Sequence, residues 1–450
     1  MSPFQHQSWL ETKETTMSIF KSRMILWTLV LILAVGSASC GPKTPTGPVT
    51  IRVLTTNQAG MTADEWNSIT QQFMAANPDI KVELYFVSDS QVEDQFTKGM
   101  TAYPPAYDVV MVNPTWVDRW IKAGYLADIT KRITPDMQQN IFPTAWEVVT
   151  RSGKSYGVPW SPDMKFLYYN RNLLAQVGFT DPPKTWEELV GMAQAIKEMG
   201  LVAYPITWSW KQPDDATADF TALLSGNGGK FLDDQDRPVF NDDKGVAVLS
   251  WMKQTIDDGL SDPASLTYTE SDVLRTFNAG QTAFVLDWIS LYDSAQFDRA
   301  NSQIVGKVGI TTVPVFQSMT ATIPSASVNG TRSLSIAGSS LHSDQAWKFI
   351  TYLMGFDVQM KYASAQLPVW SNAYVDGNLN ILRASSHGGP VAVPVFAEQF
   401  KDIYLLPTIP YYPDGSTALQ QAIQLALTGQ KSPQDALNTA ATQWIGFAKK

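Results

Sequence analysis

The stretch VTIRVLT at residues 49–55 alternates apolar and polar side chains and is rich in β-branched residues, which is typical of a β-strand. Residues 61–77 follow with apolar side chains at helical spacing. Two further strands are predicted, KVELYFV at 81–87 and YDVVMV at 107–112, with a helix around 91–100 between them. This β-α-β-α-β order predicts an α/β fold in which helices cover both faces of a parallel sheet.

Ligands of such sheets bind where the strands end at their carboxyl side. The candidate ligand residues that follow the first and third strands are Gln58, Asn113 and Trp116. The alternative for Trp116 is that it begins the next helix and faces the core of the protein.

A second region of alternating elements covers residues 166–297. Strands are predicted near residues 165–169, 203–207 and 282–286, with a helix at 186–199. After this region the pattern predicts a strand at 333–336 and helices at 343–354, 417–428 and 433–449. Two lobes are expected, because the roughly 410 residues that follow the N-terminal segment exceed what one hydrophobic core normally organises.

The composition excludes several classes of function. The formal net charge is −9 at pH 7 and no basic cluster occurs, so nucleic acid is not an expected partner. One cysteine in the chain allows no intramolecular disulfide. Beyond residue 40 the two histidines, His342 and His387, are far apart in sequence. We therefore predict no metal cluster, no Ser-His-Asp arrangement and no cofactor.

Tryptophan is abundant, at fifteen of 450 residues. Many of these residues stand beside Pro, Ser, Asp or Asn in predicted loops. Exposed indoles in such places are costly unless a ligand covers them. The tryptophans are therefore candidates for ligand contact.

The N-terminal segment has the pattern of a bacterial lipoprotein precursor. The sequence KSRMILWTLVLILAVGSAS, residues 21–39, has basic residues before an apolar run and ends in small residues directly before Cys40. This apolar run is shorter than the roughly 20 residues of a membrane-spanning helix. That length favours a cleaved signal over the alternative, a permanent anchor helix.

The expected boundaries follow from this reading. Residues 1–39 are the predicted signal segment, with Met17 as the expected true start because the polar residues before it do not fit a signal. Residues 40–48 are the lipidated cysteine and a Pro- and Gly-containing tether. Lipid on Cys40 would hold the protein at a membrane surface.

Five segments carry a resemblance to a known family. They are YGVPWSPDMKFLYYNRNLLAQVGFTDPPKTWEEL at 156–189, FNAGQTAFVLDW at 277–288, KVGITTVP at 307–314, SDQAWKFITYLMG at 343–355 and TGQKSPQDALNTAATQW at 428–444. In this order they resemble the extracellular solute-binding proteins of family 1, the sugar-binding lipoproteins of ABC importers that include the maltose- and trehalose-type proteins.

The resemblance implies a periplasmic-binding-protein-like fold of two doubly wound α/β lobes joined by crossing segments near 159–163, 312–314 and 363–367. The implied N-terminal lobe is 49–159 with 315–362, and the implied C-terminal lobe is 160–314 with 363–450. The implied function is binding of a mono- or oligosaccharide between the lobes and its delivery to the permease of an ABC transporter. The protein would act as a monomer outside the cytoplasmic membrane and would catalyse no reaction.

Sugar recognition needs flat aromatic faces, and carboxylates or amides that accept hydrogen bonds from hydroxyl groups. Trp288 ends the FVLDW strand and matches the family's stacking aromatic; the alternative is that it covers the core of its lobe. Asp287 could bind a hydroxyl or cap the following helix. Asp163 lies where the family carries a cleft carboxylate, although an Asp after Pro162 is also an ordinary turn residue.

The other candidates are mostly aromatic. Trp208 and Trp210 end a predicted strand, and their i, i+2 spacing puts both on one face if the strand continues. Tyr411 and Tyr412 lie where the resemblance implies an aromatic of the C-terminal loop. A final group, each member of which has a structural alternative, consists of Trp160, Trp370 and Arg332.

Two other functions fit part of this pattern. A secreted glycoside hydrolase also combines tryptophans with carboxylates, and Asp163 with Asp287 could form its pair. The same fold could instead bind a polyamine or a phosphate ester. Against these ligands, the candidate residues include few carboxylates, and Arg332 is their one obvious cation.

Overall fold

The computed structural model describes residues 47–56, 61–211, 213–384 and 392–449. The chain divides into two units between Pro48 and Val49, and every helix and strand below belongs to the second unit. The predictions for the signal segment, Cys40 and Gln58 fall outside the described residues. No helix among the described residues has the length and apolar character needed to cross a membrane.

The first sheet has the strand order β2-β1-β3-β12-β6. Strands β1 (Val49–Thr55), β2 (Ile80–Phe86) and β3 (Val109–Val112) are parallel, as their sequence pattern predicts. Strand β12 (Arg332–Ile336) joins this sheet antiparallel to β3 and to β6 (Val158–Ser161).

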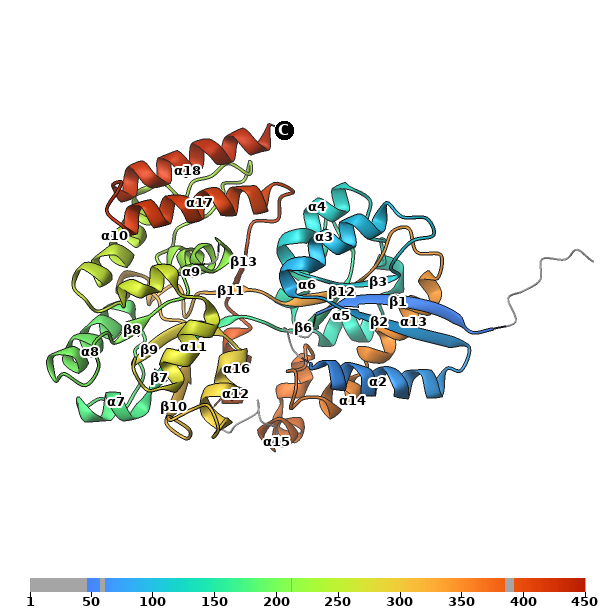
Figure 1. Ribbon diagram of the computed structural model, residues 1–450, viewed down its shortest axis with the longest axis horizontal. Coiled ribbons are helices and arrows are strands. Elements are labelled where there is room, and N and C mark those ends of the chain that lie inside the picture. The colour runs from blue at the N-terminus through green and yellow to red at the C-terminus, as the bar shows by residue number, and fades with distance from the viewer. Residues whose placement is uncertain (1–46, 57–60, 212, 385–391, 450) are drawn as a thin grey trace, which may run out of the picture. The chain divides into compact units, whose positions relative to one another are not determined.

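Alternate residues of the first sheet face two different layers of helices. Ile51 and Val53 of β1 pack with α2 (Ala63–Ala76) and α13 (Ser343–Leu353), whereas Leu54 packs with α3 (Asp89–Met100) and α4 (Val117–Lys122). Figure 1 shows α3 and α4 on one side of these strands and α2 with α14 (Phe356–Lys361) on the other. The predicted covering of both faces is therefore confirmed for this lobe.

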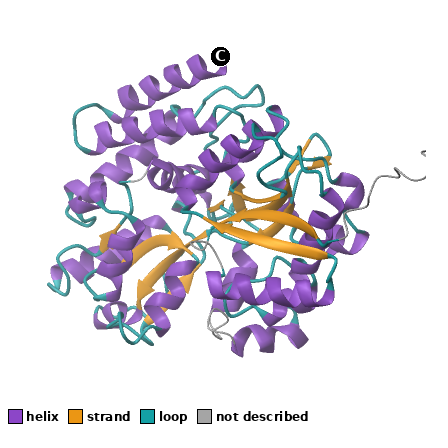
Figure 2. Cartoon of the chain, turned by 45° about the vertical axis from the view of Figure 1, so that its right-hand side comes forward, coloured by secondary structure: helices purple, strands orange, loops and turns teal. Residues whose placement is uncertain are grey.

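The second sheet has the strand order β10-β7-β9-β8. Strand β7 (Lys165–Asn170) lies antiparallel to β9 (Phe284–Trp288) and to β10 (Val308–Thr311), and the short β8 (Ile206–Thr207) lies parallel to β9. One face packs on α8 (Trp186–Glu198), and the other packs on α11 (Glu270–Asn278) and α12 (Ser290–Phe297). Figure 2 shows the two groups of strands, each among helices.

Four longer helices complete the second lobe: α9 (Pro213–Gly226), α10 (Asp243–Asp257), α17 (Tyr412–Leu427) and α18 (Pro433–Ala448). The remaining elements are short. They are η1 (Pro114–Trp116), η2 (Thr130–Arg132), α5 (Pro135–Asn140), α6 (Pro143–Glu147), β4 (Thr150–Arg151), β5 (Lys154–Ser155), α7 (Arg171–Gln176), η3 (Pro263–Thr267), η4 (Gln317–Met319), η5 (Ser371–Tyr374), α15 (Asp376–Ala384) and α16 (Ala392–Gln399).

The chain passes between the two sheets in paired segments. The first passage joins β6 to β7, and its Met164 forms a bridge with Asn329 of β11 (Ser327–Asn329). The Gly330 N–H donates to the Asp163 carbonyl at 2.8 Å. Strand β11 also pairs in parallel with β13 (Ile403–Leu405), which forms a small sheet between the two larger ones (Figure 1).

Two expected lobe boundaries are wrong by several residues. Val315 forms a bridge with Thr185, and the Phe316 N–H donates to the Gly226 carbonyl at 3.1 Å, so this segment stays with the second lobe. The chain enters the first sheet only at Arg332. Likewise, the Phe142 N–H donates to the Val369 carbonyl at 3.2 Å, so the segment expected to cross at 363–367 still packs on the first lobe. Loop segments without periodicity gave no signal for these contacts.

Candidate functional site

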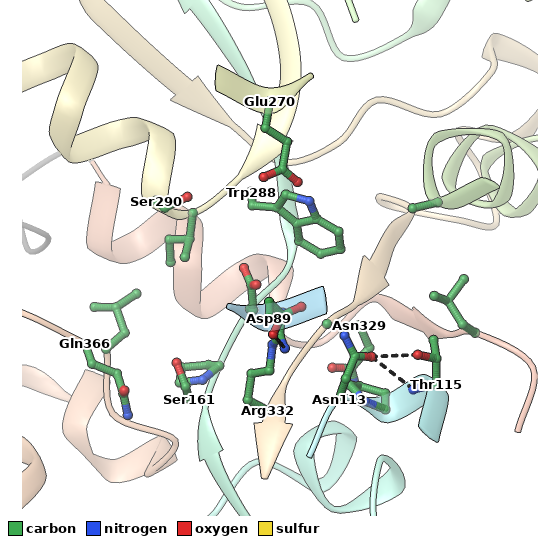
Figure 3. A pocket seen from close by; sticks show the side chains of 18 of the residues that line it. Asp89, Asn113, Thr115, Ser161, Glu270, Trp288, Ser290, Asn329, Arg332 and Gln366 are labelled. Carbon is green, nitrogen blue, oxygen red and sulfur yellow. Dashed lines mark hydrogen bonds and ion pairs between the residues drawn. The ribbon is translucent and has the colours of Figure 1, made fainter. Parts of the chain in front are cut away.

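A polar pocket lies where the two lobes meet, and both lobes contribute to its lining. The first lobe supplies residues from α3, β6, β12 and the end of β3, and the second supplies residues from α9, α11 and the end of β9. Its lining side chains that carry polar or aromatic groups are Asp89, Asn113, Thr115, Ser161, Asp163, Asp215, Glu270, Trp288, Ser290, Asn329, Arg332 and Gln366. Most of them are labelled in Figure 3.

Trp288 is the aromatic side chain of this lining. It ends β9, and the Tyr168 hydroxyl donates to its carbonyl at 3.0 Å. A Cβ atom on Gly330 would lie 2.7 Å from Cζ3 of the indole, so the ring requires a glycine at this position. The Lys165 Nζ lies 5.1 Å from the ring centroid, a cation–π distance. The indole is therefore held in place by contacts from β7 and from Gly330 on the second passage between the sheets.

Lys165 and its carboxylate partners lie beneath the pocket. Both the Lys165 and the Asp219 side chains are fully buried, and the ammonium donates to Asp219 at 2.6 Å. Burial opposes the charge on Lys165, but Asp219, Asp215 and Asp287 outweigh this effect and raise its pKa above the ordinary value. The Trp210 Nε1 donates to the other oxygen of Asp219 at 3.0 Å. The buried Asp219 carboxylate is thus compensated by the charge of Lys165 and by hydrogen bonds from Lys165 and Trp210.

Arg332 stands in the wall of the pocket on the side of the first lobe. Its guanidinium binds Asp89 through both Nη atoms, with 3.2 Å from Nη2 to Oδ2. Its Nε is buried and has no hydrogen-bond partner among the described residues. Arg332 therefore keeps one donor that the pocket does not satisfy.

Asp163 is a half-buried carboxyl on the first passage between the sheets, and it lines the pocket. Burial raises its pKa to about 7; Arg332 opposes this rise and Glu270 adds to it. Its Oδ1 has no hydrogen-bond partner among the described residues. Near neutral pH this group can therefore exchange a proton and accept a hydrogen bond from a ligand.

Amide side chains shape the rest of the lining. The Asn113 Oδ1 accepts from the Thr115 N–H at 3.1 Å and from the Thr115 hydroxyl at 2.9 Å (Figure 3). Asn113 thereby caps the start of η1 directly after β3. The Asn329 Nδ2 donates to the Thr144 carbonyl at 2.8 Å. The Gln366 Nε2 donates to the Trp160 carbonyl at 2.8 Å, while its Oε1 is buried without a partner among the described residues.

The structure brings four of the sequence-predicted site residues together in this lining: Asn113, Asp163, Trp288 and Arg332. Asp287 lies just behind it, is 3% exposed, and accepts from the Trp288 N–H at 2.7 Å. Burial, followed by the charge of Glu270, raises the pKa of Asp287 well above its usual range, and Lys165 opposes this rise.

Five predicted tryptophans lie in hydrophobic cores and not in the pocket lining. Trp208 and Trp210 follow β8 and stack on each other in the core of the second lobe, with ring centroids 5.0 Å apart. Trp160 contacts the ring of Trp66 in the first lobe. The other two are Trp116, which packs against Trp120, and Trp370, which donates through Nε1 to the Met354 carbonyl.

The two predicted tyrosines are also outside the lining. Tyr412 begins α17, is fully buried and packs against Trp444. Tyr411 is half-buried and contacts the same indole, and its hydroxyl donates to the Asp236 carbonyl at 3.4 Å. Pro410 and Pro413 predict a loop around the two tyrosines. Residues 406–411 lie outside helix and strand, and α17 begins at Tyr412.

Several lining residues were not predicted, among them Asp89, Ser161, Asp215, Glu270 and Gln366. Asp89 follows the second strand, and that position was a usable signal. Asp215 and Glu270 lie in the first turns of α9 and α11, where acidic residues are common for electrostatic reasons alone. Their sequence context therefore could not separate a ligand contact from an ordinary helix start.

The arrangement is suited to binding a polar solute. Carboxylates and amides from both lobes can accept from hydroxyl groups, and one indole can contact an apolar ring face. Among the described residues, no group of three or more His, Cys, Asp or Glu side chains is arranged to hold a metal ion.

The sequence is similar to known proteins over most of its length. The family model described as bacterial extracellular solute-binding protein matches residues 59–360. A probable ABC transporter-binding protein of Deinococcus radiodurans is 28% identical over 350 residues, which are 75% of this chain and 79% of that protein. The diacetylchitobiose binding protein DasA of Streptomyces coelicolor is 24% identical over 343 residues, 74% of this chain and 76% of that protein.

A solved structure is similar as well. The structure of maltose-bound T. maritima MalE3 matches with a TM-score of 0.76 and 26% sequence identity, covering 88% of this chain and 99% of that chain. The match includes two α/β lobes, so the predicted fold class is confirmed.

Proposed function

Because the chain belongs to the bacterial extracellular solute-binding proteins, we propose that it binds a mono- or oligosaccharide in the pocket between its lobes and delivers it to a membrane permease. The observation that carries this proposal is the pocket itself. The Trp288 indole can contact a pyranose ring, and polar groups from both lobes, such as Asn113 and Asp163, can bind its hydroxyl groups.

Binding by both lobes gives a mechanism for delivery. A ligand that contacts Asn113 on one lobe and Trp288 on the other favours the state in which the lobes are together, because only that state makes both sets of contacts. Opening of the lobes at a permease would remove half of the contacts and release the solute. The protein needs no catalysed reaction for this role.

The membrane attachment proposed here rests on Cys40 and the sequence before it. Mass spectrometry of the protein from bacterial membranes should find a lipid-modified N-terminal cysteine at this position. A Cys40→Ser variant should be recovered without the modification. An unmodified Cys40 in the membrane-derived protein would contradict the lipid anchor.

The test of solute binding is a thermal unfolding series with mono-, di- and trisaccharides. Ligand at about 100 times its Kd stabilises the folded state by about 2.7 kcal/mol, which gives a measurable rise in Tm. Trp288→Ala should remove that rise. Tyr103→Ala removes an aromatic ring that is 93% exposed and outside the pocket, so this control should keep the rise.

Two results would contradict the proposal. The first is the absence of any rise in Tm across the series of saccharides. The second is turnover of an aryl-glycoside by the purified protein, which would indicate a hydrolase.

A further inference from the structure

The pocket and the layer beneath it contain more carboxyl groups than cations. Four carboxyl side chains line it: Asp89, Asp163, Asp215 and Glu270. Asp219 and Asp287 lie behind this lining, within the electrostatic influence of Lys165. The cations among these residues are Lys165 and Arg332. The sequence alone suggested few carboxylates here, because Asp215 and Glu270 were not among the predicted residues.

Both cations are already engaged with other carboxylates. Lys165 forms its ion pair with Asp219, and Arg332 forms its pair with Asp89. Asp163, Asp215 and Glu270 have no Lys or Arg nitrogen within salt-bridge distance among the described residues. The lining therefore holds three carboxyl groups without a paired cation.

Asp215 is the most informative of the three. Asp215 is 5% exposed and lines the pocket from α9. Its Oδ2 nevertheless has no hydrogen-bond partner among the described residues. Burial raises its pKa well above the usual range, Lys165 opposes the rise, and the nearby charge of Glu270 adds to it. A buried acceptor of this kind, facing a pocket, indicates a donor that arrives with the ligand.

A neutral sugar would satisfy these carboxylates only in part. Its hydroxyl groups supply hydrogen bonds but no charge, so a neutral sugar leaves Asp215 in the protonated form that burial favours, whereas a bound cation favours the charged carboxylate. A protonated amine supplies three donors and a compensating positive charge. We propose that the transported saccharide carries such an amine, bound between Asp215 and Glu270. This inference rests on the proposed function and specifies its ligand class.

The surrounding groups fit one orientation of such a ligand. In Figure 3 the Glu270 carboxylate and the Trp288 indole lie on one side of the pocket, and Asp89 with Arg332 lies on the other. The amine therefore binds on the side of the second lobe, where an indole face also attracts a cation. The hydroxyl groups of the sugar then face Asn113 and the partnerless Nε of Arg332.

Matched pairs of sugars test this inference. Isothermal titration calorimetry would compare glucosamine with glucose, galactosamine with galactose, and the β-1,4-linked glucosamine dimer with cellobiose. At least one amine-bearing sugar should bind about tenfold or more tightly than its hydroxyl counterpart, a difference of about 1.4 kcal/mol. N-acetylation of that sugar removes the positive charge and should abolish the preference.

Two variants connect the preference to the residues. Glu270→Gln and Asp215→Asn should each bring the ratio of the two affinities close to one. Glu270 is half-buried, so its variant remains informative if Asp215→Asn does not fold. Glu198→Gln removes the same charge from an exposed carboxylate outside the pocket and should leave the ratio unchanged.

The outcomes separate this inference from the proposed function. If the hydroxyl counterparts bind as tightly as the amines or more tightly, the amine inference is overturned and the saccharide-binding function stands. If no sugar of either kind binds, both are overturned. An amine preference that persists in both Glu270→Gln and Asp215→Asn would overturn the assigned position of the amine.

Discussion

Lys165 and Arg332 are both cations among the carboxylates of the pocket, but their surroundings differ. The Lys165 side chain is fully buried and has a carboxylate partner with no exposure. The Arg332 side chain is 13% exposed, lines the pocket, and pairs with an Asp89 side chain that is 32% exposed. Lys165 therefore stabilises the lobe that carries Trp288, whereas Arg332 is placed to contact a ligand.

The largest effect is expected for Lys165→Met. This change keeps most of the side-chain volume but leaves Asp219 buried without its cation, and breaking a buried pair in this way costs about 3 to 5 kcal/mol. Denaturant unfolding should report the loss as a lower midpoint. The double variant Lys165→Met with Asp219→Asn should recover a large part of it, because the unpaired charge is then gone. A Lys165→Met protein as stable as the native one would contradict a stabilising role for Lys165.

Arg332→Met should lower the free energy of unfolding by less than Lys165→Met does, but it should weaken ligand binding. Its pair with Asp89 is partly solvated, so we expect a loss of about 1 to 3 kcal/mol in the free energy of unfolding. We also expect affinity for the sugar identified by thermal shift to fall by about tenfold or more, the effect of losing one charged hydrogen bond to the ligand. Calorimetry and unfolding of the same variant give both numbers. Equal stability losses for the Lys165 and Arg332 variants would contradict the different roles assigned to the two cations.

Asp163, the carboxyl close to Arg332, should make the stability of the protein depend on pH. Its pKa of about 7 in the folded protein lies above its usual value of about 4 in the unfolded chain. Between these two pH values the folded state therefore binds more protons than the unfolded state. Stability from this group is therefore highest at low pH, falls as pH rises from about 4 to about 7, and then stays low. Asp163→Asn should gain on the order of 2 to 3 kcal/mol relative to the native protein when pH is raised from about 5 to about 8.

The control for this prediction uses the neighbouring cation. Arg332 lowers the pKa of Asp163, so in an Arg332→Met background the decline should continue to higher pH. Unfolding midpoints of the four proteins across this range measure the effect. If Asp163→Asn and the native protein change in parallel with pH, Asp163 does not have a raised pKa.

The smallest effect is expected for an ion pair that joins the lobes away from the pocket. The Arg119 Nε donates to the Pro410 carbonyl at 3.2 Å, and its Nη2 lies 3.3 Å from Asp414 of the second lobe. The Arg119 side chain is 38% exposed, so Arg119→Ala should weaken the closed, ligand-bound state by at most about 1 kcal/mol. The ligand should then be released faster, and its affinity should fall by up to about fivefold. Arg132→Ala breaks a similarly exposed pair within the first lobe and should leave the release rate unchanged.

The fold was accessible from the sequence because its strands are short apolar runs between amphipathic helices. The i, i+2 spacing of Trp208 and Trp210 agrees with their rings stacking on each other, but local spacing could not show that they pack in the core of the second lobe and not in the pocket lining. The sequence also could not show that Asp215 and Glu270 face the same pocket. Their proximity depends on how α9 and α11 pack in three dimensions, which local periodicity does not report.

The pairing of the passages between the lobes has a mechanical consequence. Met164 and Asn329 are bridged, and the Gly330 N–H is bonded to the Asp163 carbonyl, so two connecting strands are fastened side by side. A fastened pair can bend about a line across both strands but resists rotation about its own length. We therefore expect the lobes to move with essentially one degree of freedom, so that each closure returns Trp288 to the same register opposite Asn113.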